Sequence, residues 1–189
     1  MDNLTDDSMG EKEIKSDRKI YCIWVKTGLE EHYVKKMQPL LDGAEGELSG
    51  TLYVLKKKMR LKNGKEYFET LFPGYVFFET SESDTKKFKA LCESEDFIRI
   101  LPETAAARFL CDTDANVVKS VLQYGSTIDI LHVEFNKDDK IVITDGPFKN
   151  FTGKVVAVNR RNKRVNIQFD FMNGLKVVGL SYEVVSHAK

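Results

Sequence analysis

Residues 71–78, LFPGYVFF, decide the fold of the first part of the chain. Pro73 removes a backbone donor, and Gly74 permits a backbone angle that other residues avoid, so a bend is expected at this dipeptide. The apolar residues that follow the bend predict a buried strand. The stretch therefore predicts two strands joined by a rigid, bent junction.

Upstream of the junction, the sequence predicts a hairpin. Asn63-Gly64 favours the positive φ angles of a tight turn, and apolar residues flank it at Leu52–Leu61 and Glu66–Phe68. The ascending strand of this hairpin carries the basic run Lys56–Arg60. We therefore expect a strongly basic hairpin that leads into the bent junction.

Further upstream, a strand and a helix are expected. Ile20–Val25 is a short apolar, β-branched run typical of a strand covered on both faces. Thr27–Glu30 has the form of a capping box, and apolar residues then recur at helical spacing up to Leu41. The segment Asp42–Gly50 is predicted to form a loop.

Downstream of the junction, the pattern predicts a helix at Ser83–Glu95, a strand at Phe97–Leu101 and a helix at Asp112–Gln123. The first of these helices is expected to bury Phe88, Leu91 and Cys92. The order β, α, β, β, α, β resembles a ferredoxin-like split β-α-β fold. The fold class expected for this part is α+β.

The last part of the chain is purely β in pattern. Ser126–Glu134 is ambiguous, since it could be an edge strand or a linker. After Phe135, short apolar strands alternate with turn residues, which favours a small SH3-like barrel that hides its edges by closing. The strands are expected at 140–143, 153–158, 164–169 and 175–180.

Composition supports folded domains. Hydrophobic residues make up 42% of the 189 residues, enough for packed cores. Residues 1–18 form an acidic leader that we expect to be disordered, because they offer little apolar surface to bury. With no apolar run of membrane-spanning length and no secretory signal, a soluble cytoplasmic protein is expected. Its three cysteines, without metal or redox spacing, are expected in cores: Cys22, Cys92 and Cys111.

Charge is unevenly distributed. The whole chain has a net charge of zero, but residues 136–189 hold ten basic residues against five acidic ones, so their net charge is +5. Basic clusters of this kind attract phosphates. The terminal barrel is therefore a candidate for binding nucleic acid.

The sequence offers no catalytic constellation. We find no nucleophile with a base, phosphate loop or metal-ligand spacing, and the histidines His32, His132 and His187 are dispersed. We therefore expect no enzyme activity, no catalytic or metal-binding residues and no cofactor. One alternative from the residues is an RNA-binding or ribosome-associated module, because ferredoxin-like sheets and small barrels serve many functions.

Three segments in this order resemble the bacterial NusG family of transcription elongation factors, over about residues 19–188. Tyr21–Glu30 resembles the opening of the family's N-terminal NGN domain, and Leu71–Val76 resembles its internal junction. Asp145–Val155, DGPFKNFTGKV, resembles the KOW motif of its terminal barrel. The resemblance divides the chain into a leader (1–18), an NGN domain (19–124), a linker (125–135) and a KOW domain (136–189).

The resemblance implies that the NGN domain binds the clamp helices of RNA polymerase through an exposed apolar patch, and lies near DNA in the transcription bubble. Carried over by motif position, the patch comprises Trp24, Phe72, Pro73 and Tyr75. These aromatics could instead be ordinary core residues. A monomer without membrane contact is expected.

The dense basic turn Arg160–Arg164 and the acidic leader are not features expected of the general NusG factor. They make the chain similar to the LoaP antiterminators, which implies recognition of a nascent RNA hairpin by the KOW domain and a role in transcription antitermination. The alternatives are a solvated turn, or a general factor whose KOW domain binds ribosomal or termination proteins. The expected RNA-binding residues are Lys149, Asn150, Lys154, Arg160, Arg161, Asn162, Lys163 and Arg164.

Overall fold

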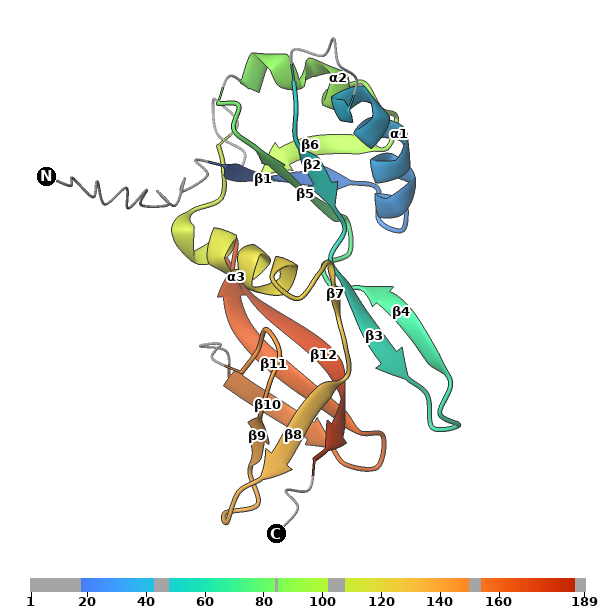
Figure 1. Cartoon of the computed structure of the whole chain (residues 1–189), viewed down its shortest axis with the longest axis vertical. Coiled ribbons are helices and arrows are strands. Elements are labelled where there is room, and N and C mark those ends of the chain that lie inside the picture. The colour runs from blue at the N-terminus through green and yellow to red at the C-terminus, as the bar shows by residue number, and fades with distance from the viewer. Residues whose placement is uncertain (1–17, 43–47, 84, 102–107, 150–153, 186–189) are drawn as a thin grey trace, which may run out of the picture.

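The computed structural model describes residues 18–42, 48–83, 85–101, 108–149 and 154–185 (Figure 1). Residues 1–17 of the expected leader lie outside these ranges, as do Asn150 and Phe151. In the first half, the elements are β1 (Lys19–Val25), α1 (Glu30–Asp42), β2 (Thr51–Tyr53), β3 (Lys56–Arg60), β4 (Glu66–Thr70), β5 (Tyr75–Thr80), η1 (Thr85–Phe88), α2 (Lys89–Cys92) and β6 (Phe97–Leu101). In the second half, they are α3 (Asp112–Leu122), β7 (Thr127–Ile128), β8 (Leu131–Phe135), β9 (Ile141–Ile143), β10 (Lys154–Asn159), β11 (Arg164–Phe171) and β12 (Gly174–Val184).

The first domain is built on a four-stranded sheet in the order β2-β5-β1-β6, with each strand antiparallel to its neighbours. Helices α1 and α2 cover one face of this sheet, and α3 lies against the opposite face (Figure 1). The chain order β, α, β, β, α, β around this sheet is the ferredoxin-like one, with the β3–β4 hairpin inserted before β5. The expected α+β fold is confirmed.

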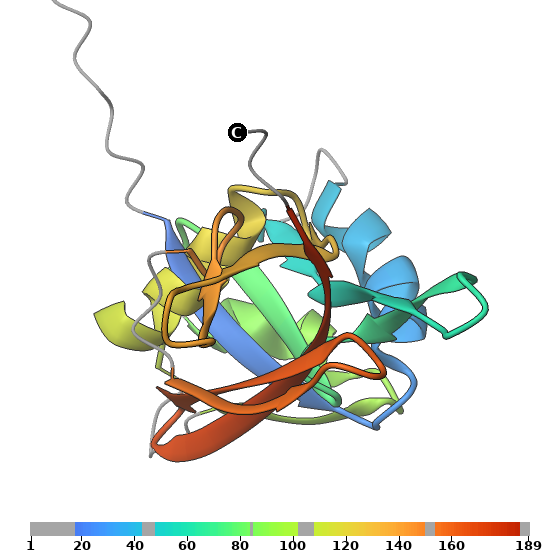
Figure 2. The same ribbon diagram turned by 90° about the horizontal axis from the view of Figure 1, so that it is seen from below.

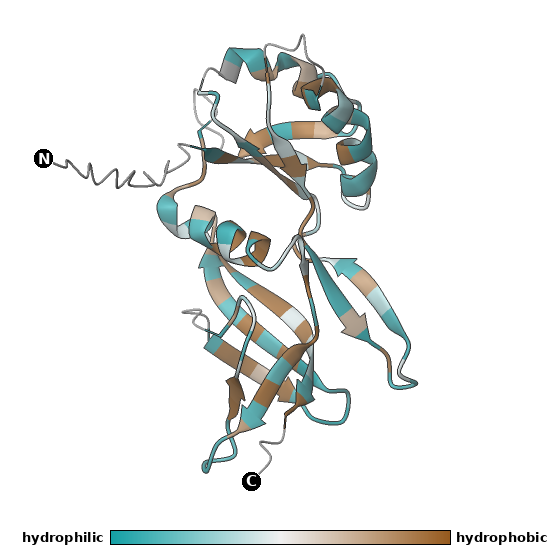
Figure 3. Ribbon diagram, viewed as in Figure 1, coloured by the Kyte–Doolittle hydropathy of each residue, from teal (hydrophilic) through white to brown (hydrophobic). Residues whose placement is uncertain are grey.

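Strand β1 is buried on both faces, because successive side chains of a strand point to opposite sides. Tyr21 and Ile23 join the cluster under α1 and α2, whereas Ile20 and Cys22 join a second cluster with α3 and the terminal strands. The sheet therefore separates two apolar layers. Figure 3 shows apolar residues on β1 and β5, and again on the terminal strands β11 and β12.

The hairpin around Asn63-Gly64 forms as predicted. Strand β3 pairs antiparallel with β4, and Gly64 has a φ of 84°, the left-handed conformation that glycine tolerates best. The prediction of one continuous strand over Leu52–Leu61 is wrong. Strand β2 belongs to the four-stranded sheet, and β3 belongs to a separate sheet with β4 and β7.

The terminal domain is a five-stranded barrel in the order β10-β11-β12-β8-β9 (Figure 2). Strand β8 pairs in parallel with β12 and antiparallel with β9. Part of the segment expected as a linker, 125–135, is thus strand. Because one apolar cluster runs from β1 through α3 into β11 and β12, the two-domain division remains a proposal.

Two further expectations differ from the structure. The helix expected over Ser83–Glu95 consists of only η1 and α2, and it buries Phe88 and Leu91 but exposes Cys92. Cys111 is also exposed, so Cys22 alone fits the prediction of core cysteines. Both exposed cysteines lie at helix ends, where apolar periodicity does not reliably predict whether a side chain is buried.

No helix in the described ranges has the length and apolar character needed to cross a membrane.

Candidate docking face and basic turn

The bent junction is held by a buried carboxylate. Glu30 is only 3% exposed, and its Oε1 accepts hydrogen bonds from the backbone N–H groups of Gly28 at 3.1 Å and Gly74 at 2.5 Å. Gly74 has a φ of 84°, and a Cβ there would lie 3.2 Å from the Trp24 indole nitrogen. Helix α1 thus begins at Glu30, and its first carboxylate fixes the Pro-Gly bend against Trp24.

This bend presents four aromatic side chains on the sheet face opposite α1. Trp24 and Tyr75 are partners in the β1–β5 register, and Phe77 lies two residues beyond Tyr75 on the same face. The Arg99 guanidinium lies 4.6 Å from the Trp24 ring, a cation–π distance. We name the surface formed by Trp24, Phe72, Tyr75 and Phe77 the aromatic face.

The barrel covers the aromatic face. Phe72 stacks on Phe171 of β11, with ring centroids 4.7 Å apart and planes 13° apart, and Phe171 also meets Phe77. Lys176 of β12 places its Nζ 5.5 Å from the Tyr75 ring. Phe72 is therefore only 4% exposed, so the expectation of an exposed patch is wrong for this residue in this arrangement. Trp24 and Tyr75 are half-buried, and Pro73 is exposed.

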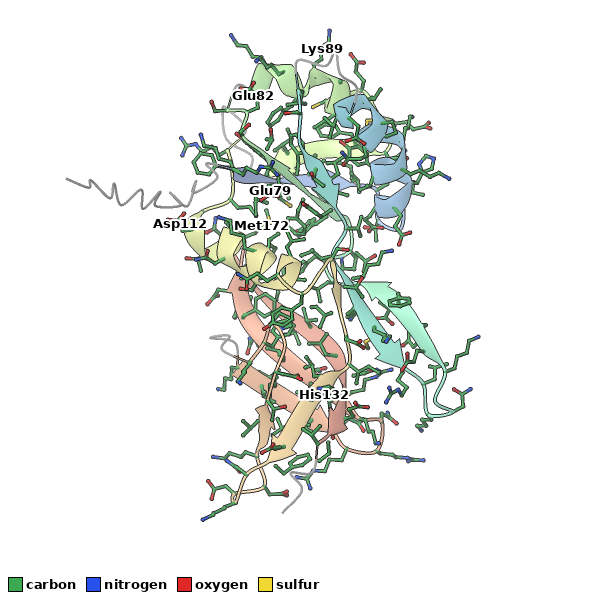
Figure 4. The ribbon with its side chains drawn as sticks, viewed as in Figure 1. Glu79, Glu82, Lys89, Asp112, His132 and Met172 are labelled. Carbon is green, nitrogen blue, oxygen red and sulfur yellow. The ribbon has the colours of Figure 1, made fainter. Side chains whose placement is uncertain are left out.

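Beside these contacts, a cavity of about 630 Å³ lies between the sheet and the barrel. Its lining includes Trp24, Phe109 and Met172. Met172 belongs to the β11–β12 turn, and its backbone N–H donates to Asp114 of α3 at 2.9 Å (Figure 4). The turn thus attaches the barrel to α3 next to the aromatic face.

A second, polar contact joins the barrel to strand β3. Lys57 Nζ donates to the Gly179 carbonyl at 2.9 Å, and the Arg60 backbone N–H donates to Ser181 Oγ at 3.0 Å. The Arg60 guanidinium also pairs with Glu183 of β12 at 3.0 Å. The basic strand is therefore largely occupied by contacts with the barrel and with nearby carboxylates.

His132 extends this polar network into the barrel. Its Nδ1 lies 2.6 Å from Asp145, and its Nε2 lies 3.0 Å from Glu183 (Figure 4). The hydrogen bond with Asp145, assisted by Glu183, raises the pKa of His132 above its ordinary 6.5. The Arg60 guanidinium, followed by His132, lowers the pKa of Glu183.

The structure brings five of the predicted RNA-binding residues together in the β10–β11 turn, residues 160–164. Arg160 pairs with Asp139 at 2.6 Å and lies over the Phe135 ring. Arg161 and Lys163 are exposed, and neither has an ion-pair partner among the described residues. Lys154 is exposed at the opposite end of β10, so it does not join this cluster. Lys149 is exposed beside the KOW turn.

The fifth member, Arg164, points toward the first domain. Its Nη2 donates to the Arg60 carbonyl at 2.8 Å, and it also reaches the Tyr67 hydroxyl at 3.5 Å and Met59 Sδ at 3.8 Å. Sequence reasoning missed this contact, and it missed the network of Arg60, Glu183 and His132. One sequence feature indicated the aromatic contact: the apolar alternation of β11 ends in two aromatic residues, Phe169 and Phe171.

The fold combines a ferredoxin-like sheet and its helices with a small terminal barrel. Residues 137–168 match the KOW motif. The chain is similar in structure to Thermotoga maritima NusG, at 16% sequence identity and a TM-score of 0.60, over 87% of this chain and 93% of that one. A match to the MjSpt4:Spt5 complex (conformation B) covers 87% of this chain and 99% of that one at 15% identity, but its TM-score of 0.34 carries no argument.

The expected NusG-type architecture is thus confirmed. The chain is similar in fold to Thermotoga maritima NusG and has a KOW motif in its barrel, which supports the NusG family resemblance drawn from its sequence.

Proposed function

We propose that this chain is a transcription elongation factor that binds RNA polymerase through its aromatic face. The observation that carries the proposal is the position of Phe72 and Tyr75. Tyr33 and Phe78 belong to the core cluster on the α1 side of the sheet, whereas Phe72 and Phe77 share the opposite cluster with α3 and with Phe169 and Phe171 of the barrel. Aromatic side chains on a rigid bend are well suited to meet a partner.

The docked barrel implies a regulated factor. Phe72 cannot contact polymerase while Phe171 is stacked on it, so the two domains must separate before polymerase binds. The similar NusG structure of Thermotoga maritima was itself described in terms of a domain interaction. Under this proposal, the apparent affinity for polymerase is the intrinsic affinity reduced by the fraction of open molecules.

For the barrel, we propose contact with nascent RNA through the β10–β11 turn, in an antitermination role. Arg161 and Lys163 project from a tight turn in which Lys163 has a φ of 49°. Exposed, clustered cations of this kind contact phosphates, and Asn162 adds an amide that can bond base edges. This role is one of binding, not of catalysis.

A second candidate partner for the barrel is a protein. Leu175 and Val177 lie two residues apart on β12, so they share one face, and they are 65% and 55% exposed. Lys176, between them, faces the first domain, so this apolar face points away from it. The observation favours a protein partner on that side of the barrel.

A pull-down with purified RNA polymerase tests the docking proposal. We expect Phe72→Asp to abolish binding, because a carboxylate would replace the central apolar contact. Phe68→Asp is the matched control, since Phe68 is 59% exposed on β4 and lies outside the aromatic face. Circular dichroism establishes that both variants are folded. Full polymerase binding by folded Phe72→Asp would disprove the docking surface.

A further inference from the structure

A groove of about 460 Å³ lies between the tip of the β3–β4 hairpin and the β10–β11 turn. The hairpin contributes Leu61, Lys62 and Asn63, and the turn contributes Asn162 and Arg164. Among the residues that the structure describes, no acidic one lines this groove. It is therefore a concave, basic and polar site that exists only while the two domains are docked.

The acidic residues near the groove are already engaged. Glu66 pairs with Lys58 and Arg60, Glu183 pairs with Arg60, and Asp139 pairs with Arg160. Lys62 at the hairpin tip has no ion-pair partner within the described part of the chain, and the same holds for Arg161 beside the turn. Cations thus remain available on both sides of the groove.

Arg164 is held in the groove by neutral acceptors alone. A backbone carbonyl, a hydroxyl and a thioether position its guanidinium, and none of them cancels its charge. A guanidinium has five N–H donors in a planar fork that matches a phosphate. Arg164 is therefore a fixed cation with donors left for an anion.

We propose that this groove binds the phosphodiester backbone of RNA, with Lys62 of the first domain and Arg161 and Arg164 of the barrel contacting phosphates. The proposal rests on the RNA-binding function proposed above and extends that site into the first domain. Asn63 and Asn162 add amides on the two sides of the groove. Such groups can bond a 2′-hydroxyl, which distinguishes RNA from DNA. RNA bound across the groove favours the docked arrangement, because it contacts both domains. RNA in the groove therefore precedes polymerase binding at the aromatic face, which requires the two domains to separate.

Fluorescence anisotropy of the full chain with a fluorescein-labelled RNA hairpin at low salt tests the groove. We expect Lys62→Gln to weaken binding severalfold and to lower the slope of log K against log salt by about 0.9, the value for one lost phosphate contact on a duplex. Lys36→Gln, an exposed charge on α1, is the matched control and should change neither quantity. An unchanged affinity and slope for Lys62→Gln would overturn the proposal that the groove binds RNA.

The variant Arg161→Gln distinguishes the groove proposal from the proposal that the barrel binds RNA, on which it rests. If Arg161→Gln weakens binding and Lys62→Gln does not, the barrel binds RNA but the groove does not extend into the first domain. If the wild-type chain fails to bind the RNA hairpin, both proposals fail. A DNA hairpin of the same sequence should bind more weakly, and equal binding would overturn the assignment to RNA.

Discussion

At the scale of single residues, Glu30 shows how a local pattern and a distant contact combine. The Thr27–Glu30 pattern predicts a carboxylate at the start of a helix, and Glu30 does bond the backbone N–H of Gly28. The same oxygen also accepts from Gly74, forty-four residues away in the chain. A capping pattern cannot predict the bond from Gly74, because the local sequence does not specify which distant backbone group packs against Glu30.

Replacing Glu30 should therefore destabilise the fold. Glu30→Ala would leave the Gly74 N–H buried without this acceptor, and we expect a loss of about 1–3 kcal/mol in the free energy of unfolding. Urea denaturation measures this loss. Glu31→Ala is the control, since Glu31 is 68% exposed and its pair with Lys56 should contribute less than about 1 kcal/mol. Equal effects of the two variants would refute the role given to Glu30.

Three residues of the aromatic face, Trp24, Phe72 and Tyr75, were predicted from the family resemblance, but their surroundings were not. Phe77, the fourth residue of this face, was not predicted. Their partner Phe171 lies two residues beyond the strand expected at 164–169, and β11 continues far enough to include it. Alternation predicts that Phe171 is buried and does not say against which domain.

At the scale of elements, strands and turns were predicted best where local chemistry determines them. Asn63-Gly64 fixes the hairpin, and the strands of the barrel follow from its apolar alternation. Residues 125–135 could not be assigned, because β8 gains its pairing from β12 at the far end of the barrel. The helix expected at Ser83–Glu95 is shorter in the structure, although Phe88 and Leu91 pack as predicted into the core cluster on the α1 side of the sheet.

The pairing of β8 with β12 should depend on pH through His132. Its pKa in the folded protein is raised above 6.5 by Asp145 and Glu183, so protonated His132 stabilises the fold. This stabilisation is fully present below pH 6.5 and is lost as pH rises through the raised pKa. We expect the urea midpoint to fall over that interval, and His132→Gln to remove this part of the pH dependence. An identical pH profile for the variant would contradict the network.

At the scale of the whole molecule, each of two surfaces with separate predicted functions contacts the other part of the chain. The aromatic face lies under β11 and β12, and the basic turn lies against the β3–β4 hairpin. The sequence predicted each surface and could not show that β11 and β12 cover the aromatic face or that the hairpin contacts the basic turn. Domain docking depends on shape and on contacts such as Arg60 with Glu183, which lie 123 residues apart.

Opening the molecule without damaging either core should increase polymerase binding. Met172 lies in the β11–β12 turn, lines the cavity beside Trp24 and packs, partly buried, against the apolar cluster shared by the sheet and the barrel. Met172→Asp would place a carboxylate near the Asp114 carboxylate, which accepts the Met172 N–H, and their repulsion would disfavour docking. The chain has one tryptophan, so a red shift of Trp24 emission would report the opening.

The most direct test of the central claim is the affinity of full-length Met172→Asp for purified RNA polymerase, compared with wild type. Leu175→Asp, which adds the same charge on the exposed outer face of β12, is the control. We predict that Met172→Asp binds polymerase more tightly than wild type, because more molecules have their aromatic face uncovered. A red-shifted Met172→Asp chain that binds polymerase no more tightly than wild type would contradict the account.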